Sequence, residues 1–257
     1  MINDEQKSRF LRAIEIAKKR GRGDSGIGTY NEKSIHKVLK YFFEPDDSFH
    51  EIPLGNFIAD IKRDNRIVEI QTSAFNNVRN RLDFFLQSNE VEIVYPIVGK
   101  KYLVWIDPGT GESEEPVLTH RKLKATTVLP ELGRLGDLFN DSRLSVICVI
   151  IEAIEYRLKD GWGNGGKRGA HSIDHIPVSL IDMVTVSNAN DILGIIPFEE
   201  NGEFTSKEFA KACGFSHKST RDISMALKFL RETGIIDKAS KKGNSIIYRI
   251  NRFDNCL

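Results

Sequence analysis

One segment of the sequence shows its secondary structure most clearly: Phe57-Ile58-Ala59-Asp60-Ile61-Lys62-Arg63-Asp64-Asn65-Arg66-Ile67-Val68-Glu69-Ile70-Gln71-Thr72. A short apolar run is followed by a polar turn at 62–66 and by a segment that alternates with a period of two, which predicts a β-hairpin. Because residues i and i+2 of a strand lie on the same side, Glu69 and Gln71 are expected on one face. The turn then brings Asp60 opposite Glu69.

The predicted closeness of Asp60 and Glu69 indicates a metal site. Two neighbouring carboxylates repel each other unless positive charge lies between them. Mg²⁺ and Mn²⁺ favour oxygen ligands and keep bound water that can be activated as a nucleophile. We therefore expect Asp60 and Glu69 to bind Mg²⁺ or Mn²⁺.

A third carboxylate, Glu32, lies upstream of the hairpin. The apolar residues that follow it recur at helical spacing and predict a helix with Glu32 near its N-terminus; they are Ile35, Val38, Leu39 and Phe42. A second helix is predicted for Ser73 to Leu86, with its apolar stripe at Leu82, Phe85 and Leu86.

The order of helix with Glu32, strand with Asp60, strand with Glu69 and Gln71, and second helix resembles the PD-(D/E)xK nuclease superfamily, which includes many restriction and repair nucleases. The resemblance covers roughly residues 25–107. It implies a restriction-endonuclease-like α/β fold, of mixed sheet flanked by helices. It also implies that Asp60, Glu69 and Glu32 bind the metal and that Gln71 completes the catalytic set.

The sequence departs from the pattern of this superfamily at two positions. Ala59 stands where proline usually precedes the aspartate, and Gln71 stands where lysine is usual. Glutamine can orient water or a phosphate by hydrogen bonding, but it supplies neither a positive charge nor a proton. Lys37, Lys62 and Arg66 are candidate replacement cations, and the sequence does not choose among them.

The C-terminal residues 201–257 carry eleven Lys or Arg against six Asp or Glu, although the whole chain has a net charge of only +1. A capped helix is predicted from Thr205 to Gly214, a second helix at 219–233, and two strands around a turn at 241–244. This order resembles a winged helix-turn-helix domain over 202–252. A local basic excess is what phosphate binding requires.

The winged-helix resemblance implies that the second helix enters the DNA major groove and that the wing touches the backbone. The residues predicted to contact DNA are Lys218, Ser219, Thr220, Arg221, Lys241 and Lys242. A winged helix that contacts other proteins is the alternative.

Between these regions the sequence predicts a helical connector. It comprises a linker or short helix at 129–138, a helix from Arg143 to Lys159 and a glycine-rich loop at 160–171. In that loop Lys167 and Arg168 are further candidates for phosphate contact. Upstream, strands are predicted at 91–98 and 101–106, separated by Gly99-Lys100. The expected organisation is a nuclease-like domain at 1–128, the connector at 129–200 and the winged helix at 201–257.

Length and composition favour a cytoplasmic globular protein. The 257 residues contain no apolar stretch near the roughly 20 residues of a membrane span, and the polar N-terminus lacks the apolar region of a signal peptide. The three cysteines, Cys148, Cys213 and Cys256, are scattered and have no zinc or redox spacing. The expected partner is DNA, with no membrane; a homodimer is left open, because double-strand cutting by this fold commonly implies one.

The sequence therefore predicts a Mg²⁺-dependent or Mn²⁺-dependent DNA endonuclease. The runner-up is a non-catalytic DNA-binding regulator in which the nuclease fold has become a scaffold. A third hypothesis, a winged-helix adaptor that binds proteins, would show no salt-dependent affinity for DNA.

Overall fold

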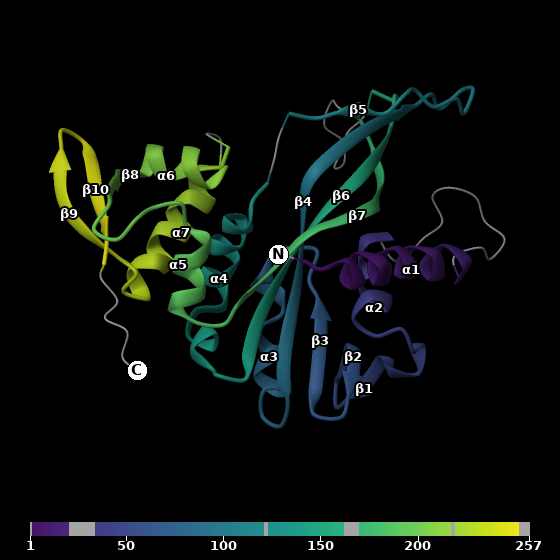
Figure 1. The fold of residues 1–257 in the computed structure, drawn as a ribbon, viewed down its shortest axis with the longest axis horizontal. Coiled ribbons are helices and arrows are strands. Elements are labelled where there is room, and N and C mark those ends of the chain that lie inside the picture. Colours follow the sequence, from purple (N-terminus) through teal and green to yellow (C-terminus); the bar gives the residue numbers. More distant parts are fainter. Residues whose placement is uncertain (1, 21–33, 121–122, 162–169, 217–218, 252–257) are drawn as a thin grey trace.

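The computed structural model describes residues 2–20, 34–120, 123–161, 170–216 and 219–251 (Figure 1). The helices are α1 (Asp4–Arg20), α2 (Ser34–Phe43), α3 (Arg79–Phe85), α4 (Leu129–Leu135), α5 (Ala189–Ile195), α6 (Ser206–Cys213) and α7 (Thr220–Glu232), with short 3-10 turns η1 (Asp47–Phe49), η2 (Phe75–Asn77), η3 (Ala125–Val128) and η4 (Gly136–Asn140). The strands are β1 (His50–Leu54), β2 (Phe57–Arg63), β3 (Arg66–Ile70), β4 (Glu90–Ile106), β5 (Val117–Leu118), β6 (Leu144–Leu158), β7 (Ser172–Val186), β8 (Glu203–Thr205), β9 (Ile236–Lys242) and β10 (Ser245–Ile250).

The protein is a mixed α/β structure with a seven-stranded sheet in the order β1-β2-β3-β4-β6-β7, in which β5 pairs with β4. Strands β3, β4 and β6 are mutually parallel, and the pairs β1/β2, β2/β3 and β6/β7 are antiparallel. Helices α1 and α2 cover one face with one apolar cluster, and α3 and α4 belong to a second cluster on the other face (Figure 1). Helices on both faces are what a parallel centre requires, since its strands are buried on both sides.

The predicted hairpin at 57–72 is confirmed as β2 and β3. The two strands pair at Ile61↔Val68, Lys62↔Ile67 and Arg63↔Arg66. Asp64 lies in the tight turn with φ of 49°, a conformation that aspartate tolerates better than most residues. The helix predicted after Glu32 is also confirmed, as α2, and the one predicted for 73–86 is shorter than expected, as η2 and α3.

Residues 91–106 form one strand and not two strands separated by a turn at Gly99-Lys100. The pairing of β4 with β6 shifts between Val98 and Lys100, so Gly99 marks an irregularity within a continuous strand. A Cβ atom at Gly99 would lie 2.6 Å from Ile150 Cγ2, which is closer than two carbon atoms can approach. Glycine is required there because a neighbouring side chain packs against the backbone.

The helix predicted from Arg143 to Lys159 is wrong, because strand β6 occupies these residues. Together with β7 it joins the main sheet, so the span 129–200 is not a helical connector. Of the linker or short helix expected at 129–138, the short helix is present as α4. A strand buried on both faces carries a continuous apolar run, which periodicity alone does not distinguish from a buried helix.

The elements predicted near the C-terminus are confirmed. Thr205 and Glu208 form a capping box at the start of α6, and Gly214 ends the helix in the left-handed conformation with φ of 79°. Helix α7 follows, and β8, β10 and β9 form a three-stranded antiparallel sheet in that order.

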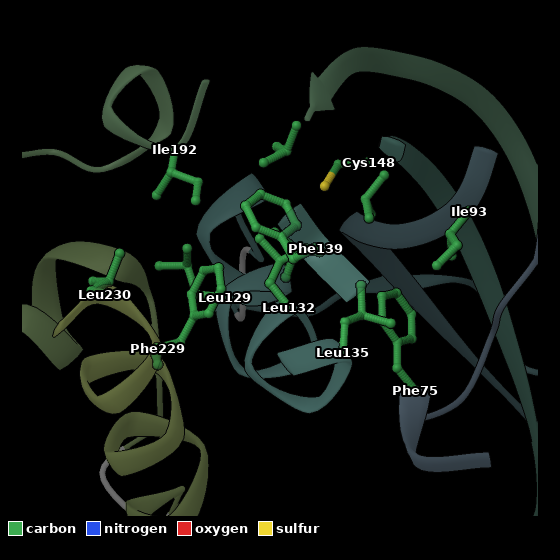
Figure 2. Close-up of a cluster of buried hydrophobic side chains, with 14 of the residues drawn as sticks. Phe75, Ile93, Leu129, Leu132, Leu135, Phe139, Cys148, Ile192, Phe229 and Leu230 are labelled. Atoms are coloured by element: carbon green, nitrogen blue, oxygen red, sulfur yellow. The ribbon is translucent and has the colours of Figure 1, made fainter. Parts of the chain in front are cut away.

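One apolar cluster joins this C-terminal region to the main sheet (Figure 2). Leu129, Leu132 and Leu135 of α4 lie between Phe75 and Cys148 on the sheet side and Phe229 of α7. The rings of Phe139 and Phe229 meet edge to face with centroids 5.4 Å apart. Polar contacts support the same junction, because the buried Thr126 hydroxyl donates to Cys213 O at 2.7 Å. Helix α7 is therefore fixed relative to the large sheet.

Within the residues that the structure describes, none of the helices is both long enough and apolar enough to cross a membrane.

Candidate active site

The predicted carboxylate pair is brought together where strands β2 and β3 separate. Their pairing ends at Ile61↔Val68. Beyond this point the backbone N–H of Asp60 donates to Glu69 Oε1 at 3.2 Å, and the N–H of Ile70 donates to Asp60 Oδ2 at 2.7 Å. The two side chains thus replace the missing strand-to-strand bonds, and this cross-bonding holds both carboxylates at the same end of the hairpin.

Glu69 is 1% exposed, and its carboxylate faces Arg81 of α3. Arg81 Nη2 lies 2.6 Å from Glu69 Oε2, but neither Glu69 Oε2 nor Arg81 Nε has a partner with hydrogen-bond geometry. Burial raises the pKa of Glu69 to about 7, and repulsion by the Asp60 carboxylate adds to the rise. The guanidinium of Arg81 opposes this rise without cancelling it, because burial and the Asp60 charge are the larger effects.

Asp60 differs from its neighbour in having a stabilised charge. Burial by itself would raise the pKa of Asp60, but hydrogen bonds from His36 and from the Ile70 N–H outweigh it and lower the pKa below its usual range. His36 Nε2, on α2, lies 3.2 Å from Asp60 Oδ2. The two carboxylates therefore have pKa values displaced in opposite directions, which is common in sites that bind ions or transfer protons.

Gln71 lies next to the pair, and its amide is directed toward the loop that follows β3. Its Nε2 donates to Ser73 Oγ at 2.9 Å and to Ala74 O at 3.3 Å, while its backbone N–H continues the ladder to Val94 O. Gln71 is therefore held in place by the backbone, with its side chain supporting the loop.

Of the cations considered as replacements for the missing lysine, Arg66 is paired with Glu92 at 2.6 Å. The cation that contacts the carboxylate pair is Arg81 on α3, which the sequence pattern did not indicate. Arg81 and Glu69 lie on different elements, α3 and β3, so no local spacing in the sequence indicated their contact. His36 was missed in the same way, although its place on the helix after Glu32 could have indicated it.

The carboxylate pair supplies two possible ligand groups for a divalent cation. In the described part of the chain, no group of three or more His, Cys, Asp or Glu side chains is placed to hold a metal ion. Glu32, the predicted third ligand, lies outside the described residues. Asp60 and Glu69 supply the oxygen donors that Mg²⁺ prefers, and Glu69 Oε2 is buried without a hydrogen bond. This pair fits a hard divalent cation.

A chain of polar contacts connects the loop after β3 to helix α7. The N–H of Phe75 donates to Glu131 Oε2 at 2.9 Å, and Glu131 also forms an ion pair with Arg134. Arg134 Nη2 reaches Asp222 Oδ1, in the first turn of α7, at 3.3 Å. The loop that Gln71 supports is thus tied to the helix predicted to contact DNA.

The residues predicted to contact DNA that the structure describes lie at the start of α7 and at the end of β9. Thr220, Arg221, Lys241 and Lys242 are exposed, and the half-buried Ser219 directly precedes α7. Lys218, Lys167 and Arg168 lie outside the described residues.

Helix α7 carries further exposed cations that the sequence analysis did not select. A groove of about 410 Å³ lies between α6, α7 and β10, and its polar lining consists of Ser206, Lys207, Thr220, Ser224, Lys228 and Arg231. Arg221, Lys228 and Arg231 recur at helical spacing on the exposed side of α7. Their spacing could have identified this basic face from the sequence.

Residues 33–187 match the family described as Domain of unknown function (DUF8091), and the chain belongs to this family. An uncharacterized protein of Treponema pallidum (strain Nichols) is 25% identical over 224 residues, which cover 87% of each chain. The comparison with solved structures found no match. The matched family span contains Asp60, Glu69 and Arg81 and ends just beyond β7.

Proposed function

We propose that this protein is a metal-dependent DNA endonuclease with a restriction-endonuclease-like fold and a C-terminal winged helix that holds the DNA. The observation that supports this most directly is the cross-bonded pair of Asp60 and Glu69 at the separated end of β2 and β3. A surface hairpin with incidental charges would leave these carboxylates in water. Here Glu69 is almost fully buried beside a second carboxylate, an arrangement that costs stability and has a use in cation binding.

The order of elements around the pair also supports the proposal. The elements follow one another as helix α2, antiparallel strands β1 to β3, helix α3 and parallel strand β4. The four strands are consecutive neighbours in the sheet. This is the order that the resemblance to the PD-(D/E)xK superfamily implied. Helices α6 and α7 with the β9–β10 hairpin likewise have the order of a winged helix.

In the proposed reaction a water oxygen bonds to phosphorus, the P–O bond to the leaving oxygen breaks, and the water proton lost is balanced by protonation of that oxygen. Asp60 and Glu69 would hold Mg²⁺ or Mn²⁺, with Glu32 as the predicted third ligand, and the ion would lower the pKa of water and stabilise phosphate charge. Gln71, through its contacts to Ser73 and Ala74, would fix the loop beside the acids.

DNA would lie against the exposed face of α7. Arg221, Lys228 and Arg231 offer phosphate contacts on one side of this helix, and Lys241 and Lys242 extend the positive charge to the β9–β10 turn. The proposal includes a cytoplasmic location, with which the free, buried thiols of Cys148 and Cys213 agree. It leaves open a homodimer, which double-strand cutting by this fold commonly implies.

One observation favours a second function, that of a non-catalytic DNA-binding regulator. Arg81 contacts Glu69 directly and supplies a positive charge where a metal ion would lie. If that pair is permanent, the acids stabilise the fold and the α7 surface alone is functional. The two functions differ in metal affinity at Asp60 and Glu69.

The test is cleavage of supercoiled plasmid by wild type, Asp60→Asn and the control Asp64→Asn in Mg²⁺ or Mn²⁺. Asp60→Asn keeps an acceptor for the Ile70 N–H and removes the charge, whereas Asp64 lies in the exposed turn of the same hairpin. The proposal expects nicking by wild type and Asp64→Asn and at least a roughly 100-fold loss in Asp60→Asn. Absence of cutting and of Mn²⁺ binding, with salt-dependent DNA binding retained, would instead support the regulator.

A further inference from the structure

We propose that Arg81 is a further catalytic residue, which holds the Glu69 carboxylate in the metal-free protein and binds the scissile phosphate when Glu69 binds a divalent cation. This inference rests on the proposed function. It assigns the positive charge that Gln71 cannot supply to a residue on a different element, helix α3.

The contact between Arg81 and Glu69 is close but incompletely satisfied. The atoms Arg81 Nη2 and Glu69 Oε2 are 2.6 Å apart, yet Glu69 Oε2 and Arg81 Nε are both buried without a hydrogen-bond partner. A buried structural ion pair is stabilising only when its remaining donors and acceptors are satisfied as well. Two unsatisfied atoms in one pair indicate a position that a ligand completes.

The position of Arg81 allows it to serve both partners. Its side chain is 28% exposed, whereas that of Glu69 is 2% exposed, so Arg81 lies between the buried carboxylate and solvent. Guanidinium groups bind phosphate oxygens through paired donors and carry their charge at every relevant pH. A movement of the side chain alone, with α3 in place, would transfer these donors from Glu69 to a phosphate.

The same helix offers a matched control. Arg79 is also exposed in part, but its guanidinium bonds Leu135 O and Asp137 and has no contact with the acid pair among the bonds of the described residues. The two arginines share charge and length and lie on the same helix, but their partners differ.

The experiment uses full-length wild type, Arg81→Met, Arg81→Lys and Arg79→Met. Mn²⁺ affinity is measured by isothermal titration calorimetry without DNA, and plasmid cleavage is measured at saturating Mn²⁺. Arg81→Met removes a competing cation, so we expect Mn²⁺ to bind about fivefold more tightly. Cleavage is expected to fall about 100-fold despite this, as on removal of one group that stabilises transition-state charge. Arg81→Lys should cut at an intermediate rate, and Arg79→Met should match wild type in both measurements.

A purely structural Arg81 predicts different results. If Arg81 only stabilises the fold, Arg81→Met would bind Mn²⁺ more weakly because part of the protein is unfolded. Urea unfolding of each variant would show that loss of stability. Unchanged cleavage in Arg81→Met at saturating Mn²⁺, or weaker Mn²⁺ binding by a folded Arg81→Met, overturns the inference and leaves the proposed function intact. A wild type that neither binds Mn²⁺ nor cuts DNA overturns the proposed function, and the role of Arg81 with it.

Discussion

Replacing Glu69 with glutamine should stabilise the metal-free protein at alkaline pH while abolishing its proposed activity. The pKa of Glu69 is raised from 4.5 to about 7 by burial and by the Asp60 charge. The native state therefore binds the proton more tightly than the unfolded chain, and its stability falls as pH rises from 4.5 to 7. Glutamine resembles the protonated acid and does not incur this loss.

The magnitude follows from the two pKa values. With 4.5 in the unfolded chain and about 7 in the native state, ionisation of Glu69 costs about 0.8 kcal/mol at pH 5 and about 3.3 kcal/mol at pH 8. Glu69→Gln should therefore gain about 2.5 kcal/mol relative to wild type between these two pH values. The attraction of Arg81 is already included in these figures, because it is one of the effects that set the native pKa at about 7.

The assay is urea unfolding at pH 5 and pH 8 with a chelator present. Glu155 is a matched control, because it is also a nearly buried glutamate on a strand of the sheet. Although burial would raise its pKa, hydrogen bonds from Arg157 and Lys101 lower it to about 2. Glu155 therefore contributes stability that is fully present above pH 4.5 and is lost as pH falls toward 2. Glu155→Gln should be destabilised by up to about 3 kcal/mol, and by a similar amount at pH 5 and pH 8, since both lie above the unfolded pKa of 4.5.

The reasoning fails if the difference in free energy of unfolding between Glu69→Gln and wild type is the same at both pH values. It also fails if the variant is less stable relative to wild type at pH 8 than at pH 5. Either result would mean that Arg81 keeps Glu69 ionised as a well-compensated structural ion pair. A stabilised variant without Mn²⁺ affinity would instead show a site in which function is maintained at the expense of stability.

Three further predictions concern the rest of the molecule. Phe229→Ala should lower the free energy of unfolding by about 3–5 kcal/mol in a single urea transition, because Phe229 and Phe139 belong to a core shared by α7 and the sheet; two separate transitions would disprove a shared core. The double substitution Lys228→Ala with Arg231→Ala should reduce the slope of log affinity for DNA against log salt by about 2, measured by fluorescence anisotropy, and an unchanged slope would place DNA elsewhere. Arg134→Met should reduce cleavage more than DNA affinity, since it disconnects α7 from the loop after β3, and equal losses in gel-shift and plasmid assays would argue against this connection.

The hairpin and its acid pair could be predicted because the information is local. Alternation at 67–72 fixes which side chains share a face, and a turn between 62 and 66 fixes which residue of the first strand faces Glu69. The separation of the strands beyond Ile61↔Val68 could not be predicted, although it is what allows Asp60 and Glu69 to bond each other's backbone.

The error at 143–159 and the absence of Arg81 from the predicted site have a common cause, which is that both depend on neighbours distant in sequence. The first half of strand β6 is buried on both faces, with Val146 and Cys148 in one apolar cluster and Ile147 and Val149 in the other, so its polar–apolar alternation is lost. Glu152 and Glu155 then resemble the polar side of a helix. The β-branched residues at 149–151 were the available indication of a strand. Arg81 reaches Glu69 only because α3 packs under β3 and β4, and sheet order decides that contact.

The apolar core shared by α7, α4 and the large sheet would fix the proposed DNA-binding surface relative to the proposed catalytic site. Independent modules joined by a flexible linker would let DNA bound at one sample many positions relative to the other. Here Phe229 packs on α4, α4 packs on the sheet, and Arg134 joins Asp222 of α7 to Glu131, which holds the loop next to Gln71. The proposed DNA-binding surface of α7 is therefore held at a fixed position relative to Asp60 and Glu69. Since small displacements of a reacting group are costly, such a rigid connection favours catalysis at one bond over general degradation.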